Sequence, residues 1–397
     1  MEVIFSILLV FAGLMSGGSG DSQASLSQWM TAGIGAGQTQ QPQGDGQTSG
    51  EDGTQNEPNL FQKQDPQPDA PKVKGIYVTS HTTGVERMNH LLTLLDNTAL
   101  NSMVIDIKDD HGYITYPTEN EELLELGTTQ KNISDIDALM TKLEEHDVYP
   151  IARIVVFKDS VLAKNHPDMS FRNQDGSVWK NGRGESFVNP YLKEVWDYNI
   201  AVAKEAVKHG FKEIQFDYVR FPEGFENRAD TLTYESNDES RIEIIGDFVK
   251  YAREQLEGLD VRVSVDIFGY AASVPAAEGI GQDFVKISKY VDVISPMVYP
   301  SHYSTGWFDQ KAPDKAPYET IKGAMEDTHD KLEELGIFKP IIRPWIQDFT
   351  ASWLGSGNYT KYGKAEVEAQ IQALEDTGID EYLLWNASNK YTEDAEF

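Results

Sequence analysis

Apolar positions follow two alternating patterns along most of the chain. Short runs rich in β-branched and aromatic residues predict strands, and segments with apolar residues three and four apart predict amphipathic helices. The eight predicted strands are Val73–Ser80, Ser102–Lys108, Tyr149–Phe157, Glu213–Phe221, Arg262–Gly269, Val291–Tyr299, Lys339–Asp348 and Glu381–Ala387. The predicted helices are Val85–Leu95, Ile133–Glu145, Leu192–His209, Ile242–Leu256, Tyr318–Leu335 and Ala365–Asp376, with a weaker one at Gln282–Lys289.

Eight strands that alternate with helices predict an α/β fold for residues 72–397. A (β/α)8 TIM barrel with enlarged loops accounts for this order better than a doubly wound sheet does. A doubly wound dinucleotide-binding fold would need a glycine-rich turn after an early strand. Neither that motif nor a phosphate-binding loop occurs, so no nucleotide cofactor is expected.

The first 71 residues have a different composition. Val3–Met15 is a nearly unbroken apolar run of the length of a signal-peptide core, which predicts a signal-like segment at residues 1–20. Because Glu2 occupies the usual basic flank, an uncleaved membrane anchor is the alternative. Residues 21–71 are rich in Gln, Gly, Ser and Pro and predict a disordered linker. We therefore expect an exported protein, extracellular or associated with the cell envelope, with a membrane tether through the N-terminus as one form of that association.

The charge of the chain excludes one class of partner. Its 397 residues include 64 Asp and Glu against 34 Lys and Arg, a formal net charge of −30. Neutralising phosphates needs a basic patch, and none is visible, so nucleic acid is not an expected partner. The chain has no cysteine, which excludes disulfides and thiolate metal sites. No histidine motif predicts a metal site either.

Two carboxylates are the candidate catalytic residues. The active site of such a barrel lies at the C-terminal ends of its strands. Alternation along the fourth strand turns Asp217 inward and places Arg220 on the opposite face, and alternation along the fifth turns Asp266 inward. Two inward carboxylates on neighbouring strands repel each other, so their pKa values separate into acid and base roles.

Other polar and aromatic residues at the strand ends are candidates for binding substrate or orienting the carboxylates. They are Asp106, Lys108, Arg153, Arg220, Tyr299, Trp345, Gln347 and Trp385. Asp106 and Lys108 share a face by alternation, and an internal ion pair is their alternative role. Trp345 and Trp385 could instead fill the barrel mouth. Three tryptophans in loops, expected to be exposed, would extend a sugar-binding groove: Trp179, Trp307 and Trp353.

Several motifs resemble one known family. They are Lys74–Thr79, Val104–Asp109, Phe216–Pro222 (Phe-Asp-Tyr-Val-Arg-Phe-Pro), Ser264–Gly269 and Ser295–Pro300. They are similar to a bacterial family of glycoside-hydrolase-like barrels, long classified as a domain of unknown function and placed in the amylase-like superfamily. The resemblance covers residues 72–397 and implies a barrel that acts on a polysaccharide. It matches Asp217 to the amylase nucleophile and Asp266 to the general acid. The chain departs from the amylase pattern at Gln215, where an arginine is usual, and at Asp266, where glutamate is usual.

The expected function is hydrolysis of a polysaccharide or cell-wall glycan. Paired carboxylates ringed by aromatic residues are typical of glycoside hydrolases. Asp217 would act as nucleophile or base and Asp266 as acid. Arg153, Arg220 and Tyr299 would orient them, and Trp345 and Trp385 would be sugar platforms. A catalytically silent, carbohydrate-binding envelope scaffold is the main alternative. An esterase or deacetylase is a third reading, and the chain has neither a serine nucleophile elbow nor a metal motif for it.

Overall fold

The computed structural model describes residues 65–336 and 339–397. The predicted signal-like segment and most of the predicted linker lie outside these residues. The strands are β1 Lys74–Val78, β2 Ser102–Lys108, β3 Tyr149–Val155, β4 Glu213–Asp217, β5 Arg262–Phe268, β6 Val293–Met297, β7 Ile341–Ile342, β8 Trp345–Gln347 and β9 Tyr382–Trp385. All pairings are parallel, in the order β5-β4-β3-β2-β1-β9-β8-β6-β7, and the additional β5–β6 pairing closes the sheet into a barrel.

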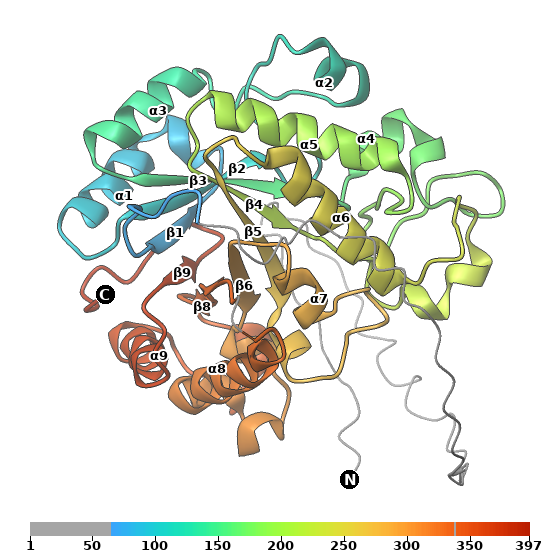
Figure 1. Cartoon of the computed structure of the whole chain (residues 1–397). Helices are drawn as coiled ribbons and strands as arrows, with labels where there is room; N and C mark the ends of the chain where they lie inside the picture. The colour runs from blue at the N-terminus through green and yellow to red at the C-terminus, as the bar shows by residue number, and fades with distance from the viewer. Residues whose placement is uncertain (1–64, 337–338) are drawn as a thin grey trace, which may run out of the picture. The chain divides into compact units, whose positions relative to one another are not determined.

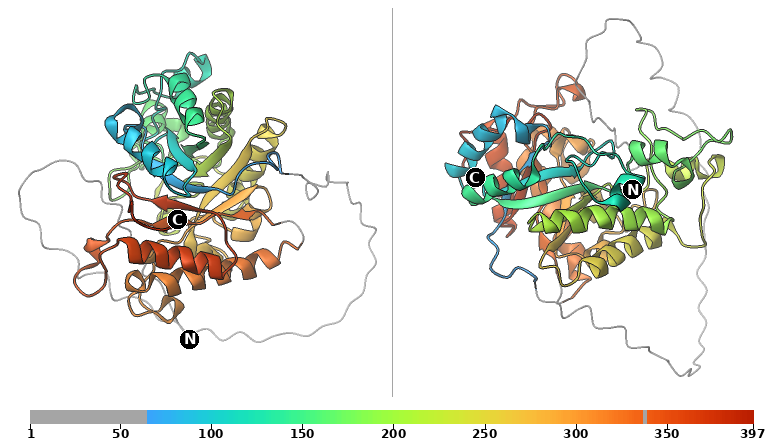
Figure 2. Two further views of the ribbon diagram at one scale, coloured as in Figure 1. Left: turned by 90° about the vertical axis from the view of Figure 1, so that its left-hand side faces the viewer. Right: turned by 90° about the horizontal axis from the view of Figure 1, so that it is seen from above.

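Helices surround the barrel (Figure 1). They are α1 Glu86–Asp96, α2 Glu121–Leu126, α3 Ile136–Glu145, α4 Ser160–Asn165, α5 Lys193–Lys208, α6 Arg241–Leu256, α7 Phe284–Ser288, α8 Pro317–Glu333 and α9 Lys364–Asp376. The views in Figure 2 show α8 and α9 side by side along one side of the barrel. The sequence pattern did not reveal α2 and α4, because six residues are too few to show a helical period.

The seventh predicted strand is interrupted. β7 and β8 both pair with β6, through Ile341 and Trp345, and they are separated by Arg343 and Pro344. Proline has no N–H to donate to the ladder, which explains the break. β7 and β8 together occupy one strand position of the barrel, so the nine assigned strands form an eight-stranded barrel. The predicted (β/α)8 barrel is therefore confirmed.

Two apolar layers hold the barrel together. The inner cluster includes Val104, Ile151 and Leu383, with Tyr299 and Trp345 nearer the mouth. The larger outer cluster fills the space between the strands and the helices. Both layers exclude water almost completely, which is the main stabilising contribution to such a fold.

The segment before β1 is attached to the N-terminal end of the barrel. Gln67 Nε2 donates to the carbonyls of Lys212 and Asp260, just before β4 and β5. Asp65 forms a salt bridge with Arg262 at the start of β5. Asp65 and Gln67, which fall at the end of the predicted linker (residues 21–71), thus have backbone and charged partners that composition does not reveal.

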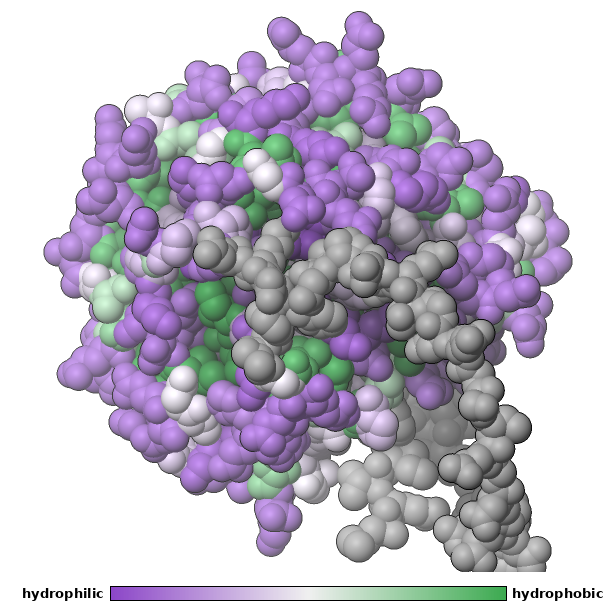
Figure 3. Space-filling model, in the orientation of Figure 1, coloured by the Kyte–Doolittle hydropathy of each residue, from purple (hydrophilic) through white to green (hydrophobic). Residues whose placement is uncertain are grey.

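Hydrophilic side chains predominate on the face shown in Figure 3, with apolar side chains between them. Within residues 65–336 and 339–397, no helix combines the length and apolarity needed to cross a bilayer.

Candidate active site

Arg153 on β3 is the centre of the candidate site. Its Nε and Nη2 donate to Oδ2 of Asp217, at 3.0 and 2.6 Å, and its Nη1 donates to Oδ1 of Asp106 at 2.7 Å. Arg153 is 1% exposed. A buried guanidinium without partners would cost several kcal/mol, so these paired carboxylates are what keep the charge inside the barrel.

Arg153 is also the register partner of Gln215. In the β3–β4 ladder Arg153 is paired with Gln215, two residues before Asp217. The guanidinium beside Asp217 therefore comes from the neighbouring third strand. Sequence spacing alone could not show this contact, because it depends on the register between two strands.

Asp266 lies in a different environment from Asp217. It is 2% exposed, and its Oδ1 accepts a hydrogen bond from Trp345 Nε1 at 2.8 Å. Burial, together with the negative charge of Asp217, raises the pKa of Asp266 well above its usual range. Asp266 is therefore protonated at a pH where an ordinary aspartate is ionised, while Asp217 is held by a cation.

Asp106 is a third inward carboxylate. It accepts a hydrogen bond from the Tyr77 hydroxyl at 2.6 Å and the bond from Arg153. Burial raises the pKa of Asp106 to about 6, although the charge of Arg153 opposes the shift. Asp106 thus lies in an internal ion pair with Arg153 that is part of the site itself.

Aromatic rings surround this group of charges. Trp385 stacks on Tyr77 with ring centroids 4.1 Å apart and is edge-on to Trp345 at 5.4 Å. The guanidinium of Arg153 lies 5.6 Å from the rings of Tyr77 and Trp385. Burial and the charges of Asp266 and Asp217 raise the pKa of Tyr299 well above its usual range, so Tyr299 stays neutral beside both carboxylates.

The predicted common face of Asp106 and Lys108 was wrong. The ladder between β2 and β3 shifts register between these two residues, and the bulge turns Lys108 outward. Its ammonium lies over the Tyr198 ring of α5 and forms a fully buried salt bridge with Asp159 at 2.7 Å. Lys108 therefore holds the start of α4 behind the barrel wall and does not face the candidate site.

The structure also changes the interpretation of Gln347. This side chain is fully buried, donates to Asp314 and to the carbonyl of Phe349, and accepts from the Ser301 backbone N–H. These bonds occupy its donors and its acceptor within the loops that follow β6 and β8. Gln347 therefore positions these loops, and its predicted substrate contact stays a prediction.

The predicted position of Arg220 on the opposite face of the fourth strand was wrong for a backbone reason. β4 ends at Asp217, and Tyr218 has a φ of 53°, so alternation does not extend to Arg220. Arg220 is buried between the Tyr218 and Phe268 rings, 4.6 Å from each, and pairs with Glu223 at 2.8 Å. A positive φ in a bulky residue is strained, and such strain is found mainly at functional sites.

The three loop tryptophans differ in exposure. Trp353 is 39% exposed and stacks on Phe349, which in turn contacts Tyr299. Trp179 is buried against Phe187, because the loop after β3 folds back on itself. Trp307 is partly buried. Of the three tryptophans, only Trp353 is exposed, as predicted for a residue that extends a groove.

Two charged residues of the site were missed from the sequence. Asp110 accepts from Arg153 at 3.1 Å and from Lys158, whose ammonium lies 3.9 Å from the centre of the Tyr218 ring. The charges of Arg153 and Lys158 overcome the effect of burial and hold the pKa of Asp110 well below its usual range. Asp110 is the second residue after β2 and Lys158 the third after β3, so a search of the first three loop positions would have found them.

Comparisons with known proteins support the fold and give the family. The glycoside hydrolase domain of PgaB (BpsB) from Bordetella bronchiseptica is 13% identical, with a TM-score of 0.55 over 80% of this chain and 95% of that one. The Bacillus cereus spore cortex-lytic enzyme SleL is 13% identical, with a TM-score of 0.47 over 82% and 74% of the two chains. A hypothetical protein from Ruminiclostridium thermocellum is 36% identical over 48% of this chain and 96% of its own, with a TM-score of 0.44.

The similarity to PgaB extends over nearly all of that domain and shows a shared barrel fold. No curated protein matches the chain. A family model matches residues 75–391, which is the barrel from β1 to beyond β9 and includes every carboxylate of the candidate site. The chain therefore belongs to the family described as "putative glycosyl hydrolase domain".

Proposed function

We propose that this protein is an exported glycoside hydrolase that cleaves a polysaccharide or cell-envelope glycan with Asp217 and Asp266. One observation carries the proposal: two inward carboxylates on adjacent strands occupy opposite electrostatic environments. Asp217 accepts two hydrogen bonds from a buried arginine, whereas the pKa of Asp266 is raised by burial and by the charge of Asp217. Pairs whose environments differ in this way divide into base and acid.

Asp266 is the general acid in this proposal. Its raised pKa keeps a proton available for the glycosidic oxygen as the bond to the leaving group breaks. Asp217, held by Arg153 at 2.6 Å, either attacks the anomeric carbon or takes a proton from the attacking water. A separation of about 5–5.5 Å between the two carboxyl groups in a substrate complex would give retention, and about 6.5–9.5 Å would give inversion.

The rings around the carboxylates provide the sugar platform. Trp385 is partly exposed, lies against Tyr77 and borders Tyr299, so one sugar ring can stack there beside the charges. Trp345 is 1% exposed, and its contact with Asp266 makes it a positioning residue for the acid.

The test is hydrolysis by variants of each carboxylate. Asp217→Asn and Asp266→Asn are expected to lose at least about 10³-fold in reducing-end release from a panel of cell-wall and capsular polysaccharides, with unchanged circular dichroism. Asp394→Asn, an exposed aspartate near the C-terminus, is the matched control and should keep full activity. Full activity of Asp217→Asn would refute the assignment.

A silent, carbohydrate-binding scaffold is the second candidate. The observation that favours it is the burial of Asp217, which limits its access to a substrate. Asp217 is 4% exposed, and its Oδ1 already accepts a hydrogen bond from the Tyr218 backbone N–H at 2.6 Å. This function predicts that the wild-type protein is retained on a polysaccharide without releasing reducing ends, and that Asp217→Asn is retained equally well.

Export is the remaining part of the proposal, and its support is the apolar run Val3–Met15. Fractionation of cells that make the protein should place it in the envelope or the medium. Mass spectrometry of its N-terminus should distinguish a cleaved signal from a retained anchor. Recovery only in the cytoplasmic fraction would contradict export and leave the hydrolase assignment standing.

A further inference from the structure

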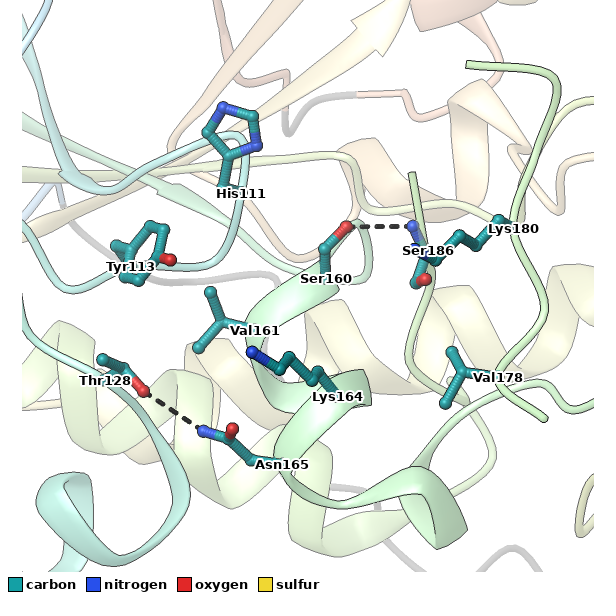
Figure 4. A pocket seen from close by; sticks show the side chains of 10 residues that line it. All are labelled: His111, Tyr113, Thr128, Ser160, Val161, Lys164, Asn165, Val178, Lys180 and Ser186. Atoms are coloured by element: carbon teal, nitrogen blue, oxygen red, sulfur yellow. Dashed lines mark hydrogen bonds between the residues drawn. The ribbon is translucent and has the colours of Figure 1, made fainter. Parts of the chain in front are cut away.

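A pocket of about 630 Å³ lies between the loops that follow β2 and β3 (Figure 4). His111 and Tyr113 lie on one side of it, and Lys164 of α4 and Lys180 lie on the other. This volume is within the usual range for small-molecule sites. Because both loops leave the C-terminal ends of their strands, the pocket opens at the same end of the barrel as the carboxylates.

We propose that this pocket binds an anionic group of the glycan chain, so that the substrate is an acidic polysaccharide. The inference rests on the proposed function and adds the substrate class to it. It depends on three features of the pocket: unpaired cations, acids that are already neutralised, and a direct structural connection to the candidate catalytic residues.

The cations are Lys164 and Lys180. Both are exposed, and neither has a carboxylate within 4.0 Å among residues 65–336 and 339–397. Other exposed lysines also lack a salt bridge, and what distinguishes Lys164 and Lys180 is that both line the same pocket. A polyanion approaching a protein of net charge −30 is repelled overall and needs local cations to bind.

The acids near the pocket have other partners. Asp159 is fully buried, pairs with Lys108 and caps α4 at the Leu162 N–H. Glu185 binds Arg183 at 3.2 Å and lies 3.7 Å from Lys158. Their charges are therefore compensated within the protein, and the charge that the pocket presents to a ligand is positive.

Neutral groups fix the walls of the pocket. Ser160 Oγ accepts from the Ser186 backbone N–H at 3.0 Å, and Asn165 Nδ2 donates to Thr128 Oγ1 at 3.1 Å, as the dashed lines in Figure 4 show. The first bond ties α4 to the later part of the β3 loop, and the second ties it to the β2 loop. These hydroxyl and amide groups are suited to sugar hydroxyls, and their fixed positions reduce the entropy lost on binding.

The pocket is connected to the catalytic group through Asp110. Asp110 precedes the lining residue His111 and bonds to Arg153 and Lys158. Arg153 in turn holds Asp217. The proposal therefore places the scissile bond at Asp217 and the charged substituent of a neighbouring sugar in the pocket lined by Lys164 and Lys180.

The test measures binding, so it does not depend on turnover. Calorimetry measures the binding of oligogalacturonides and of their neutral, carboxyl-reduced counterparts to the full chain. Sulfated chondroitin oligosaccharides and phosphate-bearing teichoic acid fragments are titrated in the same way, so that binding of carboxylate, sulfate and phosphate groups can be compared. Lys164→Ala and Lys180→Ala should each weaken binding of the preferred anionic probe about fivefold, and the double variant about 20-fold. Raising the salt concentration should remove most of the preference for the charged probe over the neutral one.

Lys289→Ala is the matched control. Lys289 is exposed, has no carboxylate within 4.0 Å in the described part of the chain, and lies between α7 and β6 at the N-terminal end of the barrel. Equal affinity for charged and neutral probes, or an effect of the pocket variants no larger than that of Lys289→Ala, would overturn the inference. Because binding is measured without turnover, failure of the pocket assignment is distinguishable from failure of the proposed hydrolase, which the Asp217→Asn and Asp266→Asn variants test separately.

Discussion

Replacing Trp345 by Phe tests whether Asp266 is the proton donor. The change removes the indole N–H that donates to Asp266 Oδ1 at 2.8 Å and keeps an aromatic ring in the barrel mouth. That hydrogen bond stabilises the ionised carboxylate and so opposes the rise in the pKa of Asp266 that burial causes. A hydrogen bond to a charged group contributes about 1.5–3 kcal/mol. Since one pKa unit corresponds to about 1.4 kcal/mol, the loss should raise the pKa by about 1–2 units.

The assay is the dependence of kcat/KM on pH. If Asp266 must be protonated, activity falls as the pH rises through its pKa, so the alkaline limb of the profile should move upward by about 1–2 units in Trp345→Phe. Trp196→Phe is the control, because Trp196 also donates a hydrogen bond, to the carbonyl of Pro190 at 2.7 Å, but lies on α5 outside the barrel.

A lower rate with an unmoved alkaline limb would refute this reasoning. It would mean that Trp345 matters for packing and that the proton comes from another group. Asp106, whose pKa is raised to about 6, would then be the next residue to test as the acid.

Three further predictions concern stability. Arg153→Met leaves its buried carboxylates without their cation and should lower the free energy of unfolding by about 3–5 kcal/mol in urea titrations; a loss below about 1 kcal/mol would contradict the role of the ion pairs. Gly112→Ala should lower the free energy of unfolding by at least about 2 kcal/mol, and with it Tm, because Gly112 has a φ of 99° and an added Cβ would lie 1.9 Å from Asp159 Oδ1. Gly176→Ala is the control, since Gly176 also has a positive φ but no atom lies within 4 Å of an added Cβ. Asp106 binds its proton more tightly in the folded state, so its contribution to stability falls as pH rises from about 4 to about 6. Asp106→Asn should flatten the stability curve in that window by up to about 3 kcal/mol, and an unchanged curve would argue against the raised pKa.

The fold could be predicted because the barrel repeats one pattern. Each strand is a short apolar run and each long helix has a clear period, so the order of elements survives errors at their ends. The β4 boundary shows what the pattern does not contain. Asp217-Tyr218-Val219 continues a strand-like sequence, but Tyr218 turns to a positive φ, and a residue's φ is set by the tertiary packing around it.

The candidate site was only partly accessible from the sequence. Alternation turned Asp217 and Asp266 inward, because the period of a strand fixes which side chains share a face. Alternation failed for Lys108, because a bulge shifts the register between β2 and β3 by one residue. The link between Arg153 and Asp217 crosses two strands, and nothing in either strand alone specifies which carboxylate an inward arginine will meet.

The attachment of Asp65 and Gln67 has a practical consequence for handling the protein. These residues are bound beneath β4 and β5, at the end of the barrel opposite the carboxylates. Residue 65, where the described chain begins, therefore lies at the pole away from the mouth. A protein immobilised directly at residue 65 should present its mouth to the solution, which makes surface-based binding measurements with long or insoluble glycans practicable.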